Sequence, residues 1–207
     1  MQQLEDLIET SKALHSGDIV YDQGEKFNKI YAIKSGSLKS VFLDEAGNER
    51  ITGFHLPGEL VGLDGIYSEQ YASTAIALET VVMCEFDFSA LSDLCLEIKS
   101  LQKQVFRLLS RDIHESQNEQ SKHIDLTAEQ KLANFLNNLS ARYQARNFSA
   151  IQFPLTMPRQ DIANHLGMAP ETISRLLKRF KEKGIVEIEK NTIHLVNESA
   201  LDDVVYC

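Results

Sequence analysis

The sequence predicts an α+β protein with an N-terminal jelly-roll β-barrel, a long helix and a C-terminal winged helix-turn-helix. Eight of the ten glycines lie between positions 17 and 65 and separate short apolar runs, which is typical of a small barrel. Residues 89–122 carry apolar side chains at helical spacing, and residues 157–180 have the pattern of two short helices joined by a tight turn. We therefore expect a barrel domain over 1–92, a helix over 93–124 and a winged helix-turn-helix domain over 125–207.

The barrel strands are expected where apolar runs alternate with glycine turns. Hairpin turns are expected at residues 35–36 and 46–48, because glycine adopts the positive φ that tight hairpins need. A short helix over residues 4–10 is expected to precede the barrel. The expected strands have the sequences IVYDQ, KIYAIKS, SLKSVFL, ERITGF, TAIALET and VVMCEFDF.

Residues 89–122 read as one long helix with an apolar stripe along it. A stripe of this length on a helix between two domains is either a core face or a dimer seam. Residues 116–121 are all polar, so we expect this end of the helix to pair weakly with a second copy. The stripe consists of Leu91, Leu94, Leu101, Val105, Leu108, Leu109 and Ile113.

The stretch from 157 to 180 has the spacing of a helix-turn-helix. Ala163 is small where two crossing helices come closest, and Gly167 follows four residues later at the bend. Ile173 comes six residues after the glycine and begins the apolar face of the second helix. Before this motif, Thr127 and Gln130 form a capping-box start for another helix. After it, an alternating stretch around residues 190–191 predicts a hairpin, the wing.

The second helix of this motif has the chemistry of a DNA-reading helix. Residues 172–183 hold five basic residues against one acid, which favours a phosphate surface. Glu171, Ser174 and Arg175 share one face near the helix N-terminus, and Arg and Glu can recognise guanine and cytosine edges. The plainer interpretation is an ordinary amphipathic helix pair with a solvated basic face. The alternative of a different class is a ligand-binding β-barrel module whose helical domain docks a protein and reads no DNA. The phosphate contacts we expect come from Arg159, Thr172, Lys178, Arg179 and Lys181.

The net charge of −9 is unevenly distributed. Residues 1–95 hold 6 Lys and Arg against 16 Asp and Glu, a balance of −10. Residues 96–125 are balanced, and residues 126–207 hold 10 against 9, a balance of +1. The acidic N-terminal half is therefore expected to stay away from DNA, which the C-terminal part binds.

The run TMPRQDIANHLGMAPETISRLLKRFKEKGIVEI resembles the DNA-binding domain of the CRP/FNR family of bacterial transcription regulators. Pro170 before Glu171, and Ser174, are closer to the FNR type than to the cAMP-receptor type. The order of motifs in the barrel also resembles the family's sensor domain, the cyclic-nucleotide-binding fold. The resemblance implies a homodimer paired along the long dimerisation helix, TTGAT-like inverted repeats, base contacts by Glu171, Ser174 and Arg175, a response to oxygen, redox or another small signal, and RNA polymerase as a partner.

The same resemblance raises the question of a cyclic nucleotide. Members that bind one have an Arg after a glycine-rich turn, and that Arg pairs with the cyclic phosphate. In this chain the position is occupied by Ala72 or Ser73, and residues 51–106 contain no Arg. A buried phosphate needs a fixed cation or many N–H donors. Asp64 and Glu69 make the local charge less favourable, so we expect no cAMP binding.

FNR-type regulators hold a four-iron cluster with three closely spaced N-terminal cysteines and a fourth in the barrel. Cys84 matches the fourth position, but no cysteine precedes it, and one thiolate cannot hold a cluster that needs four. From its place on a strand, Cys84 is expected to be a buried small apolar residue. Either the chain is a cluster-free relative, or an N-terminal extension that bears the other cysteines is missing. We expect no cofactor in this chain itself.

Several other classes are excluded by the sequence. There is no run of eighteen apolar residues and no secretory signal. Three cysteines without a C-x-x-C indicate neither a disulfide framework nor a zinc site, which favours the cytoplasm. The six histidines are scattered, so neither a cupin metal site nor a haem ligand is favoured. No catalytic motif is present, and we expect no enzyme activity.

Overall fold

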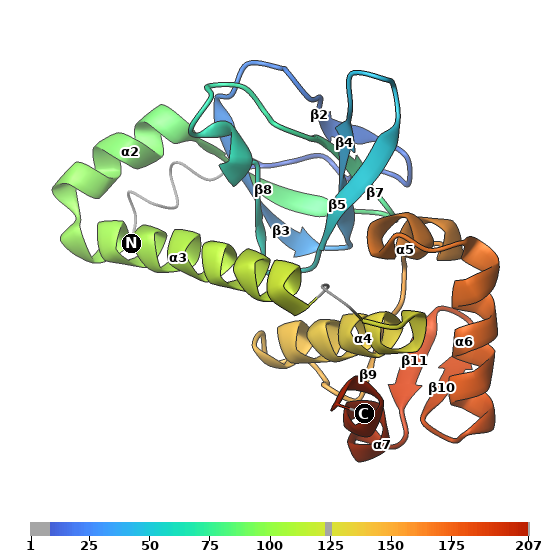
Figure 1. Cartoon of the computed structure of the whole chain (residues 1–207). Coiled ribbons are helices and arrows are strands. Elements are labelled where there is room, and N and C mark those ends of the chain that lie inside the picture. The colour runs from blue at the N-terminus through green and yellow to red at the C-terminus, as the bar shows by residue number, and fades with distance from the viewer. Residues whose placement is uncertain (1–8, 123–125, 207) are drawn as a thin grey trace. The chain divides into compact units, whose positions relative to one another are not determined.

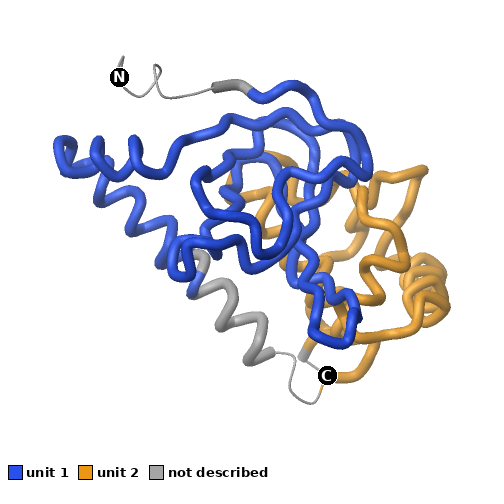
Figure 2. The backbone as a smooth tube through the Cα atoms, turned by 90° about the horizontal axis from the view of Figure 1, so that it is seen from above, with its two compact units in different colours: residues 1–122 blue, residues 123–207 orange. Residues whose placement is uncertain are grey.

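The computed structural model describes residues 9–122 and 126–206, without the side chains of residues 9–10, 112, 114–122 and 206. The chain divides into two compact units, residues 1–122 and 123–207 (Figure 2). The long helix belongs to the first unit. The finer division into a barrel over 1–92 and a dimerisation helix over 93–124 stays a prediction.

The first unit is a jelly-roll barrel of two antiparallel four-stranded sheets (Figure 1). One sheet has the order β1-β8-β3-β6 and the other β2-β7-β4-β5. A single 3-10 turn, η1 (Leu63–Gly65), follows β6. The strands are β1 (Glu9–Thr10), β2 (Ile19–Tyr21), β3 (Lys29–Ser35), β4 (Leu38–Leu43), β5 (Glu49–His55), β6 (Leu60–Val61), β7 (Thr74–Ala77) and β8 (Val82–Asp87).

Aromatic side chains fill the middle of the barrel. The ring of Tyr21 stacks on that of Tyr71 at a centroid distance of 3.9 Å, and Phe27 meets Tyr71 edge-on at 5.5 Å. The Tyr71 hydroxyl donates to the backbone oxygen of Lys29 at 2.8 Å. The core therefore satisfies this buried hydroxyl while it buries the ring.

One of the two expected hairpins is confirmed and the other is wrong. Residues 46–48 do connect the paired strands β4 and β5, and the Asp44 carboxylate accepts hydrogen bonds from the N–H groups of Ala46 and Asn48. Residues 35–36 instead carry the chain from β3 in one sheet to β4 in the other. A positive-φ glycine marks a tight turn, but it does not show which strands pair.

The single helix expected over residues 89–122 is two helices, α2 (Phe88–Glu97) and α3 (Lys99–Lys122). Ile98 breaks them with an extended backbone, φ −113° and ψ 92°. Its carbonyl oxygen accepts from the N–H groups of Leu101 and Gln102 and so begins α3. The break lets α2 pack Leu91 on the barrel core, while α3 runs back in the opposite direction (Figure 1).

The helix expected over residues 4–10 is wrong for residues 9 and 10. Residues 4–8 of the expected lead-in helix lie outside the described residues. Residues 9–10 form β1, which pairs with β8 opposite Cys84 and Glu85. Neither this strand nor β6 was expected from the sequence, because a two-residue strand is too short to show a period.

The second unit is a winged helix-turn-helix. Its three-stranded sheet has the order β10-β11-β9, and the expected hairpin around residues 190–191 connects β10 and β11. The capping box of Thr127 and Gln130 is present at the start of α4. The elements are α4 (Ala128–Gln144), β9 (Gln152–Pro154), α5 (Arg159–Leu166), α6 (Pro170–Glu182), β10 (Val186–Glu189), β11 (Thr192–Leu195) and α7 (Glu198–Tyr206).

The C-terminal helix α7 was not expected from its acidic sequence. It packs on α4 and buries Leu201 completely. Asn137 of α4 donates to the Asp202 carboxylate at 2.8 Å. Leu201, Val204 and Val205 follow helical spacing, but they span little more than one turn, which is too short a pattern to predict this helix.

Two glycines with the same backbone conformation allow a matched test of the turn between the sheets. Gly36 and Gly47 have φ values of 82° and 84°. A Cβ on Gly36 would lie 2.4 Å from the backbone oxygen of Thr80, whereas one on Gly47 meets nothing within 4 Å. Gly47→Ala should cost about 1–2 kcal/mol for its left-handed backbone, and Gly36→Ala about 1–3 kcal/mol more for the clash.

Chemical denaturation of the two variants, followed by circular dichroism, measures this difference in the free energy of unfolding. Equal losses of stability in Gly36→Ala and Gly47→Ala would show that the clash is relieved by movement and that the turn is not constrained as described.

Candidate DNA-binding site

The helix-turn-helix frame forms as the spacing predicts. α5 ends at Gly167, whose left-handed φ of 67° turns the chain, and the N–H of Met168 donates to the backbone oxygen of Ala163. α6 then begins with Pro170 at a first-turn position. Ala163 is buried. The buried face of α6 consists of Ile173, Leu176, Leu177 and Phe180.

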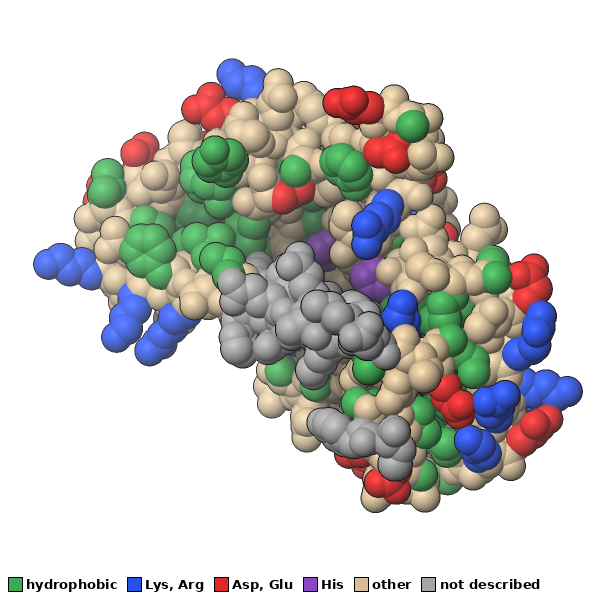
Figure 3. All heavy atoms as spheres, in the orientation of Figure 1, with side chains coloured by type: hydrophobic (Ala, Val, Ile, Leu, Met, Phe, Trp, Pro, Cys, Tyr) green, Lys and Arg blue, Asp and Glu red, His purple; other side chains and the backbone are tan. Residues whose placement is uncertain are grey.

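Burial of that face leaves the opposite face of α6 exposed. The side chains of Glu171, Ser174, Arg175 and Lys178 all lie on the exposed face. Lys and Arg side chains gather over α6 in Figure 3. The Ser174 hydroxyl donates to the backbone oxygen of Pro170 at 3.1 Å, so this side chain is held against the helix. The structure thus brings the three expected base-contacting residues together on one exposed helical turn.

The cations of α6 differ in their partners. Lys178 lies 3.8 Å from Glu182 on an exposed surface, where such a pair contributes little. Arg179 and Lys183 both pair with Glu129 in the first turn of α4. Arg175 and Lys181 have no ion-pair partner in the part of the chain that the structure describes. Fewer cations along this helix are therefore without an acidic partner than the sequence of residues 172–183 suggests.

Glu129 was not recognised from the sequence. Its Oε2 lies 2.8 Å from Nη1 of Arg179 and its Oε1 lies 3.0 Å from Nζ of Lys183. The Lys183 hydrogen bond, with the charges of both cations, holds the pKa of the Glu129 carboxyl below its ordinary value. Fifty residues separate Glu129 from Arg179 along the chain, so no local pattern could have joined them.

The wing and the start of α5 enclose a second part of the site. A cavity of about 310 Å³ lies between residues 155–159 and the wing, including Lys190 and Asn191 of its turn. Arg159 is half-buried there, and burial lowers the pKa of its guanidinium. Among the described residues it has no hydrogen-bond acceptor. A guanidinium in such a setting is suited to an anion that comes from outside the chain. Thr172, the remaining expected phosphate contact, is half-buried on α6.

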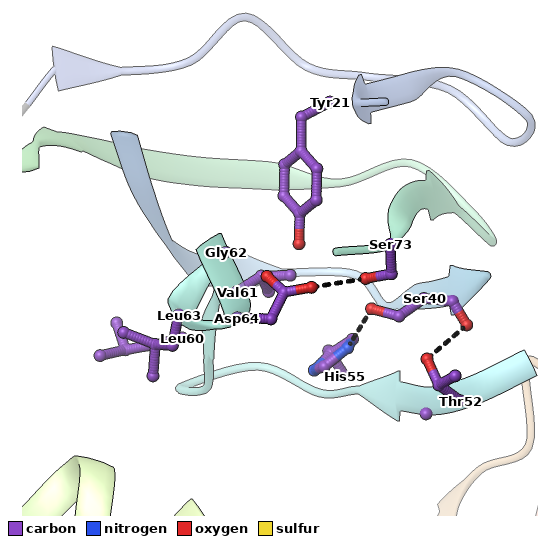
Figure 4. Close-up of a pocket in the computed structure, with 11 residues that line it drawn as sticks. Tyr21, Ser40, Thr52, His55, Leu60, Val61, Gly62, Leu63, Asp64 and Ser73 are labelled. Carbon is purple, nitrogen blue, oxygen red and sulfur yellow. Dashed lines mark hydrogen bonds between the residues drawn. The ribbon is translucent and has the colours of Figure 1, made fainter. Parts of the chain in front are cut away.

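The barrel contains a separate cavity of about 350 Å³ (Figure 4). The Tyr21 side chain points toward Asp64 and Ser73, and the Ser73 hydroxyl donates to the Asp64 carboxylate at 2.8 Å. Burial, with the Asp64 charge, raises the pKa of Tyr21 far above its ordinary value. Ser40 and His55 form a hydrogen bond of 2.7 Å. The residues lining the cavity include a carboxylate but neither Lys nor Arg.

Cys84 is half-buried, and the expectation of a buried small apolar residue is wrong. Its neighbour Met83 is the residue of β8 that packs into the barrel core, so Cys84 points to the opposite face of the sheet. Cys95 on α2 is also half-buried, and burial raises the pKa of its thiol. Cys207 lies outside the described residues. No three His, Cys, Asp or Glu side chains of the described chain gather to hold a metal ion.

The predicted seam on α3 is partly exposed in the single chain. Leu101, Val105, Leu108 and Leu109 are half-buried, and the Ile113 side chain is 59% exposed. Hydrophobic side chains also gather on the visible face over α2 and the start of α3 (Figure 3). The polar side chains of residues 116–121, expected to weaken pairing, lie outside the described ones. None of the described helices is long and apolar enough to cross a membrane.

Two family models match the two units. Residues 11–97 match the cyclic nucleotide-binding domain, and residues 130–204 match the Crp-like helix-turn-helix domain. The transcriptional activator protein Anr of Pseudomonas aeruginosa is 41% identical over 201 residues, 97% of this chain and 82% of that protein. The anaerobic regulatory protein of Haemophilus influenzae is 45% identical over 189 residues, 91% of this chain and 74% of that protein.

A solved structure shows the same fold over nearly the whole chain. FixK2 from Bradyrhizobium japonicum matches with a TM-score of 0.84 at 22% identity, over 95% of this chain and 96% of that one. Together with the two family models, this likeness confirms the expected fold class of a barrel followed by a winged helix-turn-helix. The relatives are transcription regulators and not enzymes.

Proposed function

Because the chain belongs to the CRP/FNR family of transcription regulators and is of the FNR type, we propose that it binds TTGAT-like inverted repeats as a homodimer. The observation that carries this proposal is the exposed face of α6, on which Glu171, Ser174 and Arg175 lie together. Arg can pair bidentately with guanine and Glu can accept from cytosine. Two copies of this face, related by a two-fold axis, fit a palindromic site.

Contacts to phosphate hold the helix in its groove. We assign them to Arg159, Thr172, Lys178 and Lys181, with Arg179 available only when it leaves Glu129. Such contacts carry affinity and salt dependence but little sequence information. The half-buried Arg159 beside the wing supports this division of roles.

Regulation requires a second copy and a signal. We propose that α3 pairs with α3 of a second copy along its apolar stripe, and that oxygen, redox state or another small signal shifts this pairing in the cytoplasm. RNA polymerase is the expected partner on DNA. The exposure of Ile113 in the single chain supports a seam that a partner covers.

The residues of this chain do not fit an iron–sulfur cluster. A four-iron cluster takes four thiolates, and the chain has three cysteines, of which Cys84 lies on β8 and Cys95 on α2. We derive no step through a cluster, and we propose that the signal acts through some other chemistry unless cysteines outside this sequence complete a site.

The alternative function is a ligand-binding barrel whose helical unit docks a protein and reads no DNA. A sequence-selective, salt-sensitive shift of a duplex in a gel would exclude it. A fold-intact protein that prefers no duplex over another would support it instead.

Replacing Arg175 by Ala should cost about 1–3 kcal/mol of binding free energy and relax the preference at one base position. The reason is the loss of a bidentate base contact. Fluorescence anisotropy with a set of duplexes, each changed at one position of the half-site, measures both effects.

Lys181→Ala is the matched control because Lys181 lies on the same helix and also lacks an ion-pair partner among the described residues. It should weaken binding to all duplexes alike and reduce the salt slope by about 1. If Arg175→Ala keeps the parent's base preferences, the assignment of base contacts is wrong.

Ile113→Glu should convert dimers to monomers, because it places a charge in the proposed apolar seam. Analytical ultracentrifugation measures the change, and Lys103→Ala, an exposed change on the same helix, should leave the dimer intact. A dimer of undiminished strength in Ile113→Glu would place the interface elsewhere.

Titration calorimetry with cAMP should detect no binding at mid-micromolar affinity or tighter. The lining of the barrel cavity offers a cyclic phosphate the Asp64 carboxylate and no Lys or Arg, so the anion would lose its hydration without compensation. Binding in that range would contradict this account of the cavity.

A further inference from the structure

Glu129 lies where it pairs with two cations at the C-terminal end of the helix proposed to read DNA. It belongs to the first turn of α4, and its two carboxylate oxygens bind Arg179 of α6 and Lys183, the C-cap of that helix. The Glu129 side chain is 24% exposed, whereas Arg179 and Lys183 are 55% and 51% exposed. The anion is therefore largely covered, and its two partners remain within reach of a ligand in solution.

The two cations lie on the same side of the helix as Arg175, which is proposed to contact bases. Arg175, Arg179 and Lys183 follow one another at intervals of four residues, so they lie along one side of α6. Arg175 is exposed and belongs to the face assigned to the bases. In the proposed complex, a duplex whose bases meet Arg175 would offer its phosphates to cations further along the same side of the helix, which are Arg179 and Lys183.

A structural role explains this contact poorly. Unit 2 buries Leu132 and Leu136 of α4 and Leu177 and Phe180 of α6 in the same core, each 3% exposed or less. The start of α4 has its own capping box at Thr127 and Gln130. Partly exposed ion pairs add little stability to such packing, so the main effect of Glu129 is on the charge of the exposed surface.

We propose that Glu129 is an intramolecular competitor of DNA phosphates, which withholds Arg179 and Lys183 and thereby restrains binding to DNA of arbitrary sequence. The inference rests on the DNA-binding function proposed above. Binding to arbitrary sequence depends on phosphate contacts almost alone. Removing two cations and adding one anion beside the recognition helix lowers this affinity, while the base contacts of Glu171 and Arg175 remain.

The test is the salt dependence of binding by Glu129→Gln in the full chain. Anisotropy is measured on a scrambled duplex and on a TTGAT inverted repeat of the same length, from low to high salt. The slope of log K against log salt should steepen by about 0.9 for one new phosphate contact and about 1.8 for two. If the affinities converge near 1 M salt, the variant should bind the scrambled duplex about 8-fold to 60-fold more tightly at 0.1 M.

Glu182→Gln is the matched control. It removes the same charge from α6 itself, where the carboxylate is exposed and lies 3.8 Å from a single lysine. Its effect on the slope should be well below that of Glu129→Gln. Arg179→Gln should change the slope of the parent little, because Arg179 is already engaged, but should cancel part of the gain in Glu129→Gln.

Two results would overturn the inference. One is equal steepening in Glu182→Gln and Glu129→Gln, which would show a general charge effect. The other is weaker binding by a folded Glu129→Gln with an unchanged slope, which would make Glu129 a strut that positions α6. If the parent shows no preference for the inverted repeat, the proposed function itself fails, and circular dichroism of each variant separates these results from misfolding.

Discussion

The rotation of α6 about its own axis is the constraint on which the proposed DNA contacts depend. Within the second unit, α6 has an almost fully buried face made of Ile173, Leu177 and Phe180. Because this apolar face must stay in the core, the helix cannot rotate to expose a different face. The exposed side is then decided by the 3.6-residue period alone. Glu171 and Arg175 share that side because they are one turn apart. The base recognition proposed for this unit would thus follow from apolar packing.

The net positive charge that α6 exposes depends on the acidic side chains packed beside it. The sequence gives residues 172–183 a balance of +4, but the fold places Glu129 between Arg179 and Lys183. Such a cation still binds phosphate, although it must first give up its carboxylate. If Glu129 competes with DNA phosphates as proposed, the affinity for DNA is lower, and less sensitive to salt, than the composition of α6 implies. On that proposal, selectivity increases because weaker phosphate binding leaves a larger share of the binding free energy to the base contacts.

Local patterns predicted local structure well. The helix-turn-helix followed from the spacing of Ala163 and Gly167, and the start of α4 from its capping box, because each involves residues within one or two turns of each other. The break at Ile98 was not expected because the apolar period continues across it. The two helices differ in their packing on the barrel, which the sequence does not show. The turn at Gly36 and the orientation of Cys84 depend on which strands pair. The pairing of Glu129 with Arg179 joins residues fifty positions apart, and a periodic pattern within one helix does not reveal such a contact.

The barrel shows that a fold and its ligand chemistry can be separated. Tyr21 and Tyr71 stack in a core made of the barrel's own side chains. The cavity beside them pairs its own polar groups, Ser73 with Asp64 and Ser40 with His55. A phosphate would have to enter against a carboxylate and break pairs already made, at a cost that no cation in the lining offsets. The barrel is therefore suited to hold α2 and the start of α3 in place, and a signal that changes how α3 meets a second copy need not enter this cavity.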